Sequence, residues 1–192
     1  MYHLVKGIYT SLTRKEGLDN AGKTTLLEKL KSEYSESKRG LDPDKIMPTV
    51  GQNVGHITIN GTLLRLWDVG GSENLRSLWD SYYSDAHAVV FVVDSTDRER
   101  LEECRDTLEK VVGSEATQGI PILMLANKQD REDSMGVVDI KEIFNKIAEK
   151  MGARDSRVLP VSALTGAGVA DSVDWLVTRL LRNKQDRPPN YR

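Results

Sequence analysis

The chain has 192 residues and a formal net charge of −2, a length that fits a single domain. A charge balance so close to neutral argues against nucleic-acid binding, because proteins that bind phosphate backbones are usually strongly basic. Cys104 is the only cysteine, which excludes an intrachain disulfide, and no apolar run approaches the ~18 residues needed to span a bilayer.

The first sixteen residues contain apolar side chains at helical spacing. We expect an amphipathic helix in segment 1–16, because one stripe of a helical wheel collects Leu4, Val5, Ile8, Tyr9 and Leu12. Such a stripe could bind a membrane surface, although a helix this short would bind only weakly alone, or it could pack on the domain that follows.

Strand and helix patterns alternate through the rest of the chain. Strand patterns lie at 54–59, 62–67, 88–93, 120–126 and 158–161, and helical stripes at 23–33, 101–112, 140–147 and 169–181. Asn60 and Gly61 predict a hairpin, and Cys104 falls on an apolar stripe, which indicates a core residue rather than a reactive thiol. The alternation predicts an α/β fold of three layers, a mostly parallel sheet with helices on both faces. The polar segment 183–192 has the composition of a flexible tail.

A glycine-rich segment that matches the phosphate loop G-x-x-x-x-G-K-[ST] precedes the helical stripe at 23–33. Its glycines let backbone N–H groups point at phosphate oxygens, and the positive end of a helix favours an anion. Lys23 would reach the β and γ phosphates, and the Thr24 hydroxyl would coordinate Mg²⁺; the alternative is a chance glycine loop. The predicted phosphate contacts are Gly17, Leu18, Asp19, Asn20, Ala21, Gly22, Lys23, Thr24 and Thr25.

Two further loops contain residues that suit a metal and a γ-phosphate. Asp68 ends the second hairpin strand, where an acid could hold a metal-bound water, and Gly70 and Gly71 follow it. The Gly71 N–H could bind the γ-phosphate, and Thr49 could close over both Mg²⁺ and this phosphate. Each signal is weak alone, because such residues are common in ordinary turns and loops.

Asn127, Lys128, Gln129 and Asp130 follow a buried strand pattern and predict a reader of the base. A carboxylate at Asp130 can accept two hydrogen bonds from the guanine N1–H and 2-amino group, a pair that adenine does not offer. The Lys128 stem could lie over the base, and the backbone of Ser162 and Ala163 could complete the site. The same four letters recur at 183–186, but there they follow an amphipathic helix, so we expect no role for that copy.

Together these motifs resemble the Arf branch of Ras-like GTPases. The carrying segments are GLDNAGKTT (17–25), PTVGQNVG (48–55), WDVGG (67–71), SLWDSYY (77–83), VVDSTDRERL (92–101), LANKQD (125–130) and SALTGAGV (162–169). Within the branch, Tyr2 and the segments 110–116 and 182–189 resemble the ADP-ribosylation-factor-related proteins of the Golgi.

The resemblance implies a GTP-binding domain at 17–182 that switches between GDP and GTP with Mg²⁺. Switch I would surround Thr49 and switch II would span 70–83, both ordered by the γ-phosphate and released by hydrolysis. The implied protein is a monomer of the cytosol and the Golgi membrane that acts in vesicle trafficking. Its implied partners are guanine nucleotide, an exchange factor, a GTPase-activating protein, effectors and a Golgi membrane receptor.

The chain departs from the family pattern at four places. Polar residues 13–16 occupy the place of the apolar first strand, so we expect that strand to be missing or degraded, through either a shortened isoform or a lost coding segment. Segment 4–12 could replace it, but four polar residues would then separate the strand from the phosphate loop. Ser72 stands where the family has the glutamine that orients the attacking water, which predicts slow hydrolysis. Tyr2 excludes N-myristoylation, and Gln52 replaces an apolar aromatic residue.

Three interpretations follow. The first is a GTP-dependent switch with weak GTPase activity, in which Thr49, Gly71 and Ser72 form the catalytic region and Thr24 and Thr49 bind the metal. The second is a pseudo-GTPase that is impaired in nucleotide binding and acts as a binding module, which the degraded strand and Ser72 would explain. The third is a phosphate-loop kinase or ATPase of another branch, and the suitability of Asp130 for guanine argues against it.

Overall fold

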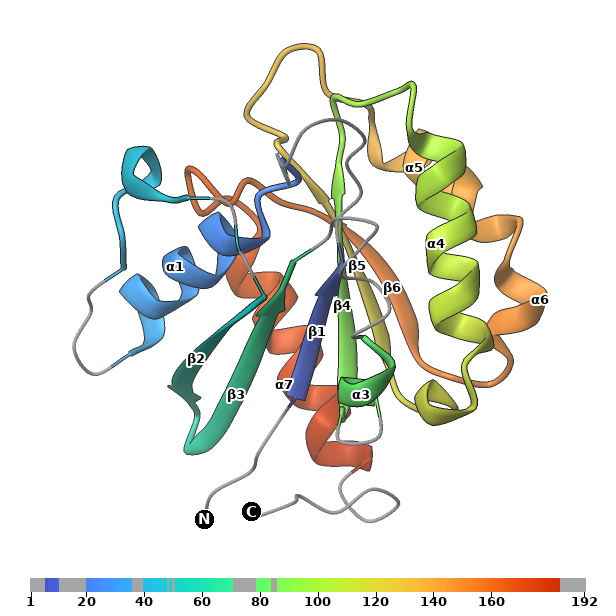
Figure 1. Ribbon diagram of the computed structural model, residues 1–192, viewed down its shortest axis with the longest axis horizontal. Helices are drawn as coiled ribbons and strands as arrows, with labels where there is room; N and C mark the ends of the chain where they lie inside the picture. The colour runs from blue at the N-terminus through green and yellow to red at the C-terminus, as the bar shows by residue number, and fades with distance from the viewer. Residues whose placement is uncertain are drawn as a thin grey trace.

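The computed structural model describes residues 6–10, 20–35, 40–47, 49, 51–70, 79–83 and 86–183. They contain a sheet of six strands in the order β2-β3-β1-β4-β5-β6 (Figure 1). Neighbouring strands are parallel except for β2 and β3, which confirms the predicted mostly parallel sheet. The strands are β1 Lys6–Thr10, β2 Gln52–Ile59, β3 Thr62–Val69, β4 Ala88–Asp94, β5 Ile122–Asn127 and β6 Ser156–Pro160.

Helices cover both faces of this sheet, as the sequence predicts. Helices α1 and α7 pack on one face, and α3, α4, α5 and α6 lie on the other. None of the helices in the described part of the chain is long and apolar enough to cross a membrane. The helices and 3₁₀ turns are α1 Lys23–Tyr34, η1 Pro43–Lys45, α3 Asp80–Tyr83, α4 Leu101–Gly113, η2 Glu115–Thr117, α5 Val137–Asn145, α6 Ala148–Met151 and α7 Val169–Asn183.

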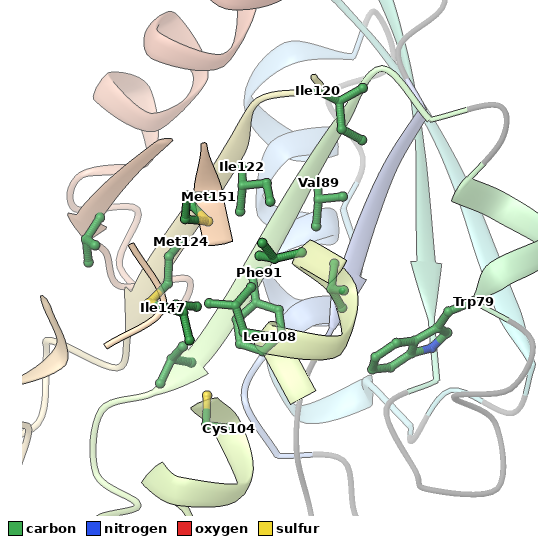
Figure 2. Packing of buried hydrophobic residues seen from close by; sticks show 14 of the residues in the cluster. Trp79, Val89, Phe91, Cys104, Leu108, Ile120, Ile122, Met124, Ile147 and Met151 are labelled. Carbon is green, nitrogen blue, oxygen red and sulfur yellow. The ribbon is translucent and has the colours of Figure 1, made fainter. Parts of the chain in front are cut away.

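Strand β4 is buried on both faces, which explains its continuous apolar sequence. Its alternate residues belong to different cores: Val90 packs with α1 and α7, and Phe91 packs with α4. Figure 2 shows Phe91 beside Leu108 of α4 in the second of these cores. Cys104 lies in the same core with 5% of its surface exposed, so its interpretation as a core residue is confirmed.

The hairpin of β2 and β3 has the predicted two-residue turn. Asn60 and Gly61 both have positive φ, 50° and 73°, as this kind of turn requires. The hairpin carries Asp68 at the end of β3, and so it brings the acid to the same edge of the sheet as the ends of the parallel strands.

The central strand β1 corrects two predictions. The sequence indicates a helix over its residues and a missing first strand, yet Lys6–Thr10 is a strand between β3 and β4. Gly7 is paired with Leu66 on one side and Ala88 on the other. Without such a strand the inner edges of β3 and β4 would have unpaired backbone groups, and pairing them outweighs a local helical preference. The polar residues 13–16 lie outside the described residues.

Candidate functional site

The predicted motifs meet at one edge of the sheet. The start of α1 lies at the same end of the molecule as the carboxyl ends of β3, β4 and β5 (Figure 1). Parallel strands present the loops that follow them along one edge, which is where open α/β sheets bind ligands. Gly17, Leu18, Asp19, Gly71 and Ser72 lie outside the described residues, and the remaining predicted site residues can be placed.

The end of the phosphate-loop motif forms the start of helix α1. Gly22 has φ 84° and caps α1 without a side-chain hydrogen bond. The first N–H groups of a helix have no partner within it, so those that follow Gly22 suit an anion. A Cβ at Gly22 would lie 2.5 Å from the Nδ2 atom of Asn127, so only glycine fits here. The Lys23 residue is 3% exposed, within this region of the site.

Thr24, Thr49 and Asp68 form a compact cluster of oxygens. The Thr24 hydroxyl donates to Oδ2 of Asp68 at 2.7 Å, and the Thr49 hydroxyl donates to the same oxygen at 3.0 Å. The two hydroxyl oxygens are 2.9 Å apart. Residues separated by up to 44 positions in the chain therefore place three oxygen groups together, as the sequence predicts for Mg²⁺.

The Asp68 carboxylate is suited to a metal ion or its water. The residue is fully buried, and its Oδ1 atom has no hydrogen-bond partner among the described residues. A buried carboxylate oxygen without a partner is costly, so an additional cation or donor would stabilise it. No group of three His, Cys, Asp or Glu side chains in the described part could hold a metal, so an ion here would need phosphate or water ligands as well.

Both backbone polar groups of Gly70 form hydrogen bonds within the protein. Its N–H donates to the carbonyl of Gly51 at 3.0 Å, and its carbonyl accepts a hydrogen bond from Nε1 of Trp79 at 3.2 Å. The contact of Gly70 with nucleotide stays a prediction. The residue instead joins the end of β3 to β2 and α3.

Asn127 connects the phosphate loop to the loop after β6. Its Nδ2 donates to the carbonyl of Ala21 at 2.6 Å, and its Oδ1 accepts from the N–H of Ala163 at 2.9 Å. The side chain is buried, with 2% exposed surface for the residue. Asn127 thus joins the phosphate loop to the loop that contains Ser162 and Ala163.

Lys128 combines a left-handed backbone conformation with an ion pair to a buried acid. Its φ is 67°, and its Nζ forms an ion pair with Oδ2 of Asp94 at 2.6 Å. The Asp94 side chain is only 8% exposed, and its Oδ1 accepts from the amide and hydroxyl of Thr96. Asp94 was not among the predicted site residues, although an acid directly after the apolar run 88–93 is a signal that could have indicated it.

Asp130 presents its carboxylate at the surface of the same loop. The residue is exposed, and its Oδ1 accepts a hydrogen bond from the Ser162 hydroxyl at 2.6 Å. Gln129 connects this loop to neighbouring segments, because its Nε2 donates to the Ser95 hydroxyl and the Met135 carbonyl. The second copy of this motif begins at Asn183, the last residue of α7, and its other residues lie outside the described ones.

A cleft of about 470 Å³ lies next to these loops. Helix α1 contributes Thr25, Glu28, Lys29 and Ser32, and the loop after β6 contributes Ala163 and Leu164. The third wall is segment 40–45. Thr25 and Ala163 are predicted nucleotide contacts, so this cleft adjoins the predicted nucleotide site.

Known proteins are similar to this chain in both fold and sequence. A small GTPase of Trypanosoma brucei, described as Arl6 BBS3 with bound GppNp, superposes with a TM-score of 0.76 at 27% identity, covering 93% of this chain and 98% of the other. The architecture is therefore the Ras-like small GTPase fold. The sequence model of the ADP-ribosylation factor family matches residues 15–180. The chain belongs to the ADP-ribosylation factor family, a class of small GTPases that bind guanine nucleotides.

Two curated relatives align along the whole chain. ADP-ribosylation factor-like protein 3 of Saccharomyces cerevisiae is 59% identical over 200 positions, covering all of both chains. ADP-ribosylation factor-related protein 1 of Homo sapiens is 45% identical over 199 positions, covering all of this chain and 98% of the relative. Because this chain has 192 residues, at least eight positions of the alignment with the yeast protein have no counterpart here.

Proposed function

We propose that this protein is a GDP/GTP switch of Golgi-associated vesicle and membrane trafficking, with slow intrinsic GTP hydrolysis. The observation that carries the switch is the cluster of Thr24, Thr49 and Asp68, which joins the phosphate loop, the loop before β2 and the end of β3. A ligand that changes the spacing of these three groups changes the position of two loops at once. Exchange factors, activating proteins and effectors are the partners that would act on this difference.

Different residues of the site would bind the phosphates, the metal ion and the base of one nucleotide. Backbone N–H groups from Asn20 to Thr25, together with the Lys23 ammonium, would bind the phosphates. The hydroxyls of Thr24 and Thr49 would be ligands of Mg²⁺, and Asp68 would accept a hydrogen bond from a water of that ion. Bound Mg²⁺ supplies positive charge that neutralises the β and γ phosphates. Thr49 and Gly71 would sense the γ-phosphate.

The base would lie between the loops after β5 and β6. The alkyl stem of Lys128 covers one face of the base, and the Asp94 ion pair restrains its ammonium group. Asp130 would accept from the guanine N1–H and 2-amino groups. The backbone of Ser162 and Ala163 would complete this pocket, at a distance from the phosphates that Asn127 fixes.

Binding of fluorescent GDP and GTPγS to the purified chain tests the proposal. We expect saturable binding that guanine nucleotides compete for, that ATP does not, and that weakens when EDTA removes Mg²⁺. A folded sample that binds neither nucleotide would instead support a pseudo-GTPase that acts as a binding module. Circular dichroism of the same sample establishes whether it is folded.

Ser72 is expected to limit hydrolysis. A serine hydroxyl is too short to orient the attacking water as a glutamine does. We expect Ser72→Gln to raise the single-turnover rate of GTP hydrolysis by about tenfold or more, since water-orienting groups contribute factors of this order. Ser72→Ala is the matched control and should leave the rate near that of the unaltered chain. Equal rates for Ser72→Gln and Ser72→Ala, with and without an activating protein, would contradict the proposal.

We further propose that the protein divides between the cytosol and the Golgi membrane, with its N-terminal segment in contact with the membrane or a Golgi receptor. The support is the resemblance that rests on Tyr2 and the segments 110–116 and 182–189. The apolar residues Leu4 and Val5, which precede β1, could contact a membrane surface. Deletion of 1–12 would also remove the central strand, so point substitutions are the better test. We expect Leu4→Glu with Val5→Glu to abolish sedimentation with Golgi membranes, and Tyr191→Glu to preserve it. Unchanged sedimentation of the double variant would contradict this role.

A further inference from the structure

Glu28 of α1 makes a long-range contact that the nucleotide site described above does not use. Its Oε2 accepts the backbone N–H of Leu41 at 2.9 Å, and its Oε1 accepts from Nζ of Lys31 at 2.6 Å. The Glu28 side chain is only 8% exposed. A buried carboxylate is stable only when it is paired, and here a cation and a backbone donor each take one oxygen.

The backbone around Leu41 lies directly against α1. A Cβ at Gly40 would lie 2.3 Å from the carbonyl oxygen of Glu28 and 3.1 Å from the Cβ of Ser32, so no larger residue fits without displacing the segment. On the adjoining strand β2, a Cβ at Gly55 would lie 2.6 Å from Cδ1 of Leu27. Two glycines thus allow the chain on either side of the loop before β2 to contact one helix.

The segment held by Glu28 forms a wall of the cleft beside the nucleotide site. Besides residues of this segment, the cleft is lined by Thr25 and Lys29 of α1 and by Ala163 and Leu164. Figure 1 shows the segment, with the η1 turn, running alongside α1 toward β2. Thr49 of the oxygen cluster follows four residues after η1. Movement of segment 40–45 away from α1 would open the cleft and pull on Thr49.

We infer that Glu28 is a positioning residue that retains bound nucleotide by holding segment 40–45 against α1. The inference rests on the proposed function, since it assigns this contact to the retention of GDP and GTP. The Lys31 ammonium binds the other oxygen of the same carboxylate, and hydrogen bonds to a carboxylate are stronger than those between neutral groups. Nucleotide release then requires the bond between Glu28 and Leu41 to break, and a partner that lifts the segment would accelerate release.

Release of fluorescent GDP from the full-length chain into excess unlabelled GDP tests the inference. Glu28→Met keeps the length of the side chain and removes the acceptor, and we expect it to accelerate release about tenfold, the effect of one hydrogen bond to a charged group. Glu28→Gln retains an oxygen for the Leu41 N–H and should stay within about threefold of the unaltered chain. Glu33→Met, on the exposed face of the same helix, is the control and should release at the original rate.

A second variant tests the same contact without altering the helix. Gly40→Ala places a methyl group against the Glu28 carbonyl, so it should also accelerate release. Trypsin cleavage after the exposed Lys45 should be faster in both Gly40→Ala and Glu28→Met when GDP is bound. Slow release from both variants, or release from Glu28→Gln as fast as from Glu28→Met, would overturn the inference. Failure of the unaltered, folded chain to bind GDP would instead overturn the proposed function.

Discussion

Replacing Asp68 with asparagine is expected to lower the affinity for GTP in the presence of Mg²⁺ about 100-fold, the scale for loss of one partner in a buried charged contact. The variant keeps the shape of the side chain but removes the negative charge beside Thr24 and Thr49. An amide in place of Oδ2 would also point a donor at these hydroxyls, which would have to turn. The metal and its water would therefore lose their fixed anionic acceptor.

The same substitution should leave the nucleotide-free protein at least as stable. In the structure, Asp68 is fully buried and its Oδ1 has no partner among the described residues, so the unloaded protein carries an incompletely paired charge. A neutral amide at this position is less costly to bury. We therefore expect the melting temperature without nucleotide to stay the same or rise, whereas Mg²⁺-dependent binding falls.

Magnesium titrations with fluorescent GTPγS separate these two effects. The difference between Asp68→Asn and the unaltered chain should disappear in EDTA, because the charge acts through the metal. Asp106→Asn, on the exposed face of α4, is the matched control for the change of an acid to an amide. If Asp68→Asn binds nucleotide with unaltered Mg²⁺ dependence, the assignment of the oxygen cluster as a metal site is wrong.

The sequence predicts the position of the site because its motifs are attached to strands with strong patterns. The apolar runs at 88–93 and 120–126 are typical of buried strands. Asn60-Gly61 predicts the hairpin that contains Asp68. Once these strands are parallel neighbours, the loops after them must meet at one edge of the sheet. The convergence of Asp68, Asn127 and Ala21 therefore follows from local patterns together with one rule of topology.

The central strand could not be predicted in the same way. Local spacing over Lys6–Thr10 favours a helix, and only the open position between β3 and β4 makes a strand the better solution. The match to the family begins at residue 15, so β1 is built from residues that precede it. The strand is therefore formed by a segment that the family pattern does not match.

The sequence also did not predict which polar side chains make long-range contacts. Glu28 and Leu41 are 13 residues apart, and Asp94 and Lys128 are 34 residues apart, and neither pair belongs to a periodic pattern. Acids and lysines are frequent in this chain, which contains 29 acidic and 27 basic residues, so composition does not indicate which of them meet. Their pairing depends on how loops and helices are placed in three dimensions.

Asp130→Asn is expected to change the base that the protein binds. Guanine offers two donors to a carboxylate at this position, whereas an amide presents one acceptor and one donor. The structure indicates how the amide would be oriented, because the Ser162 hydroxyl donates to Oδ1 and itself accepts the N–H of Thr165. With the amide oxygen held by Ser162, the NH₂ group faces the base and matches the 2-oxo group of xanthine.

We therefore expect Asp130→Asn to weaken GDP binding about 1,000-fold, because two hydrogen bonds to a charged group are lost and a donor faces the guanine 2-amino group. Competition of fluorescent GDP by GDP and xanthosine diphosphate measures the change, and xanthosine diphosphate should become the better ligand of the variant. The chain provides its own control, since Asp186 ends a second copy of the same four-residue motif after α7. Asp186→Asn should leave both affinities unchanged. If Asp186→Asn loses its selectivity for guanine, or if Asp130→Asn keeps it, the base does not bind between the loops after β5 and β6.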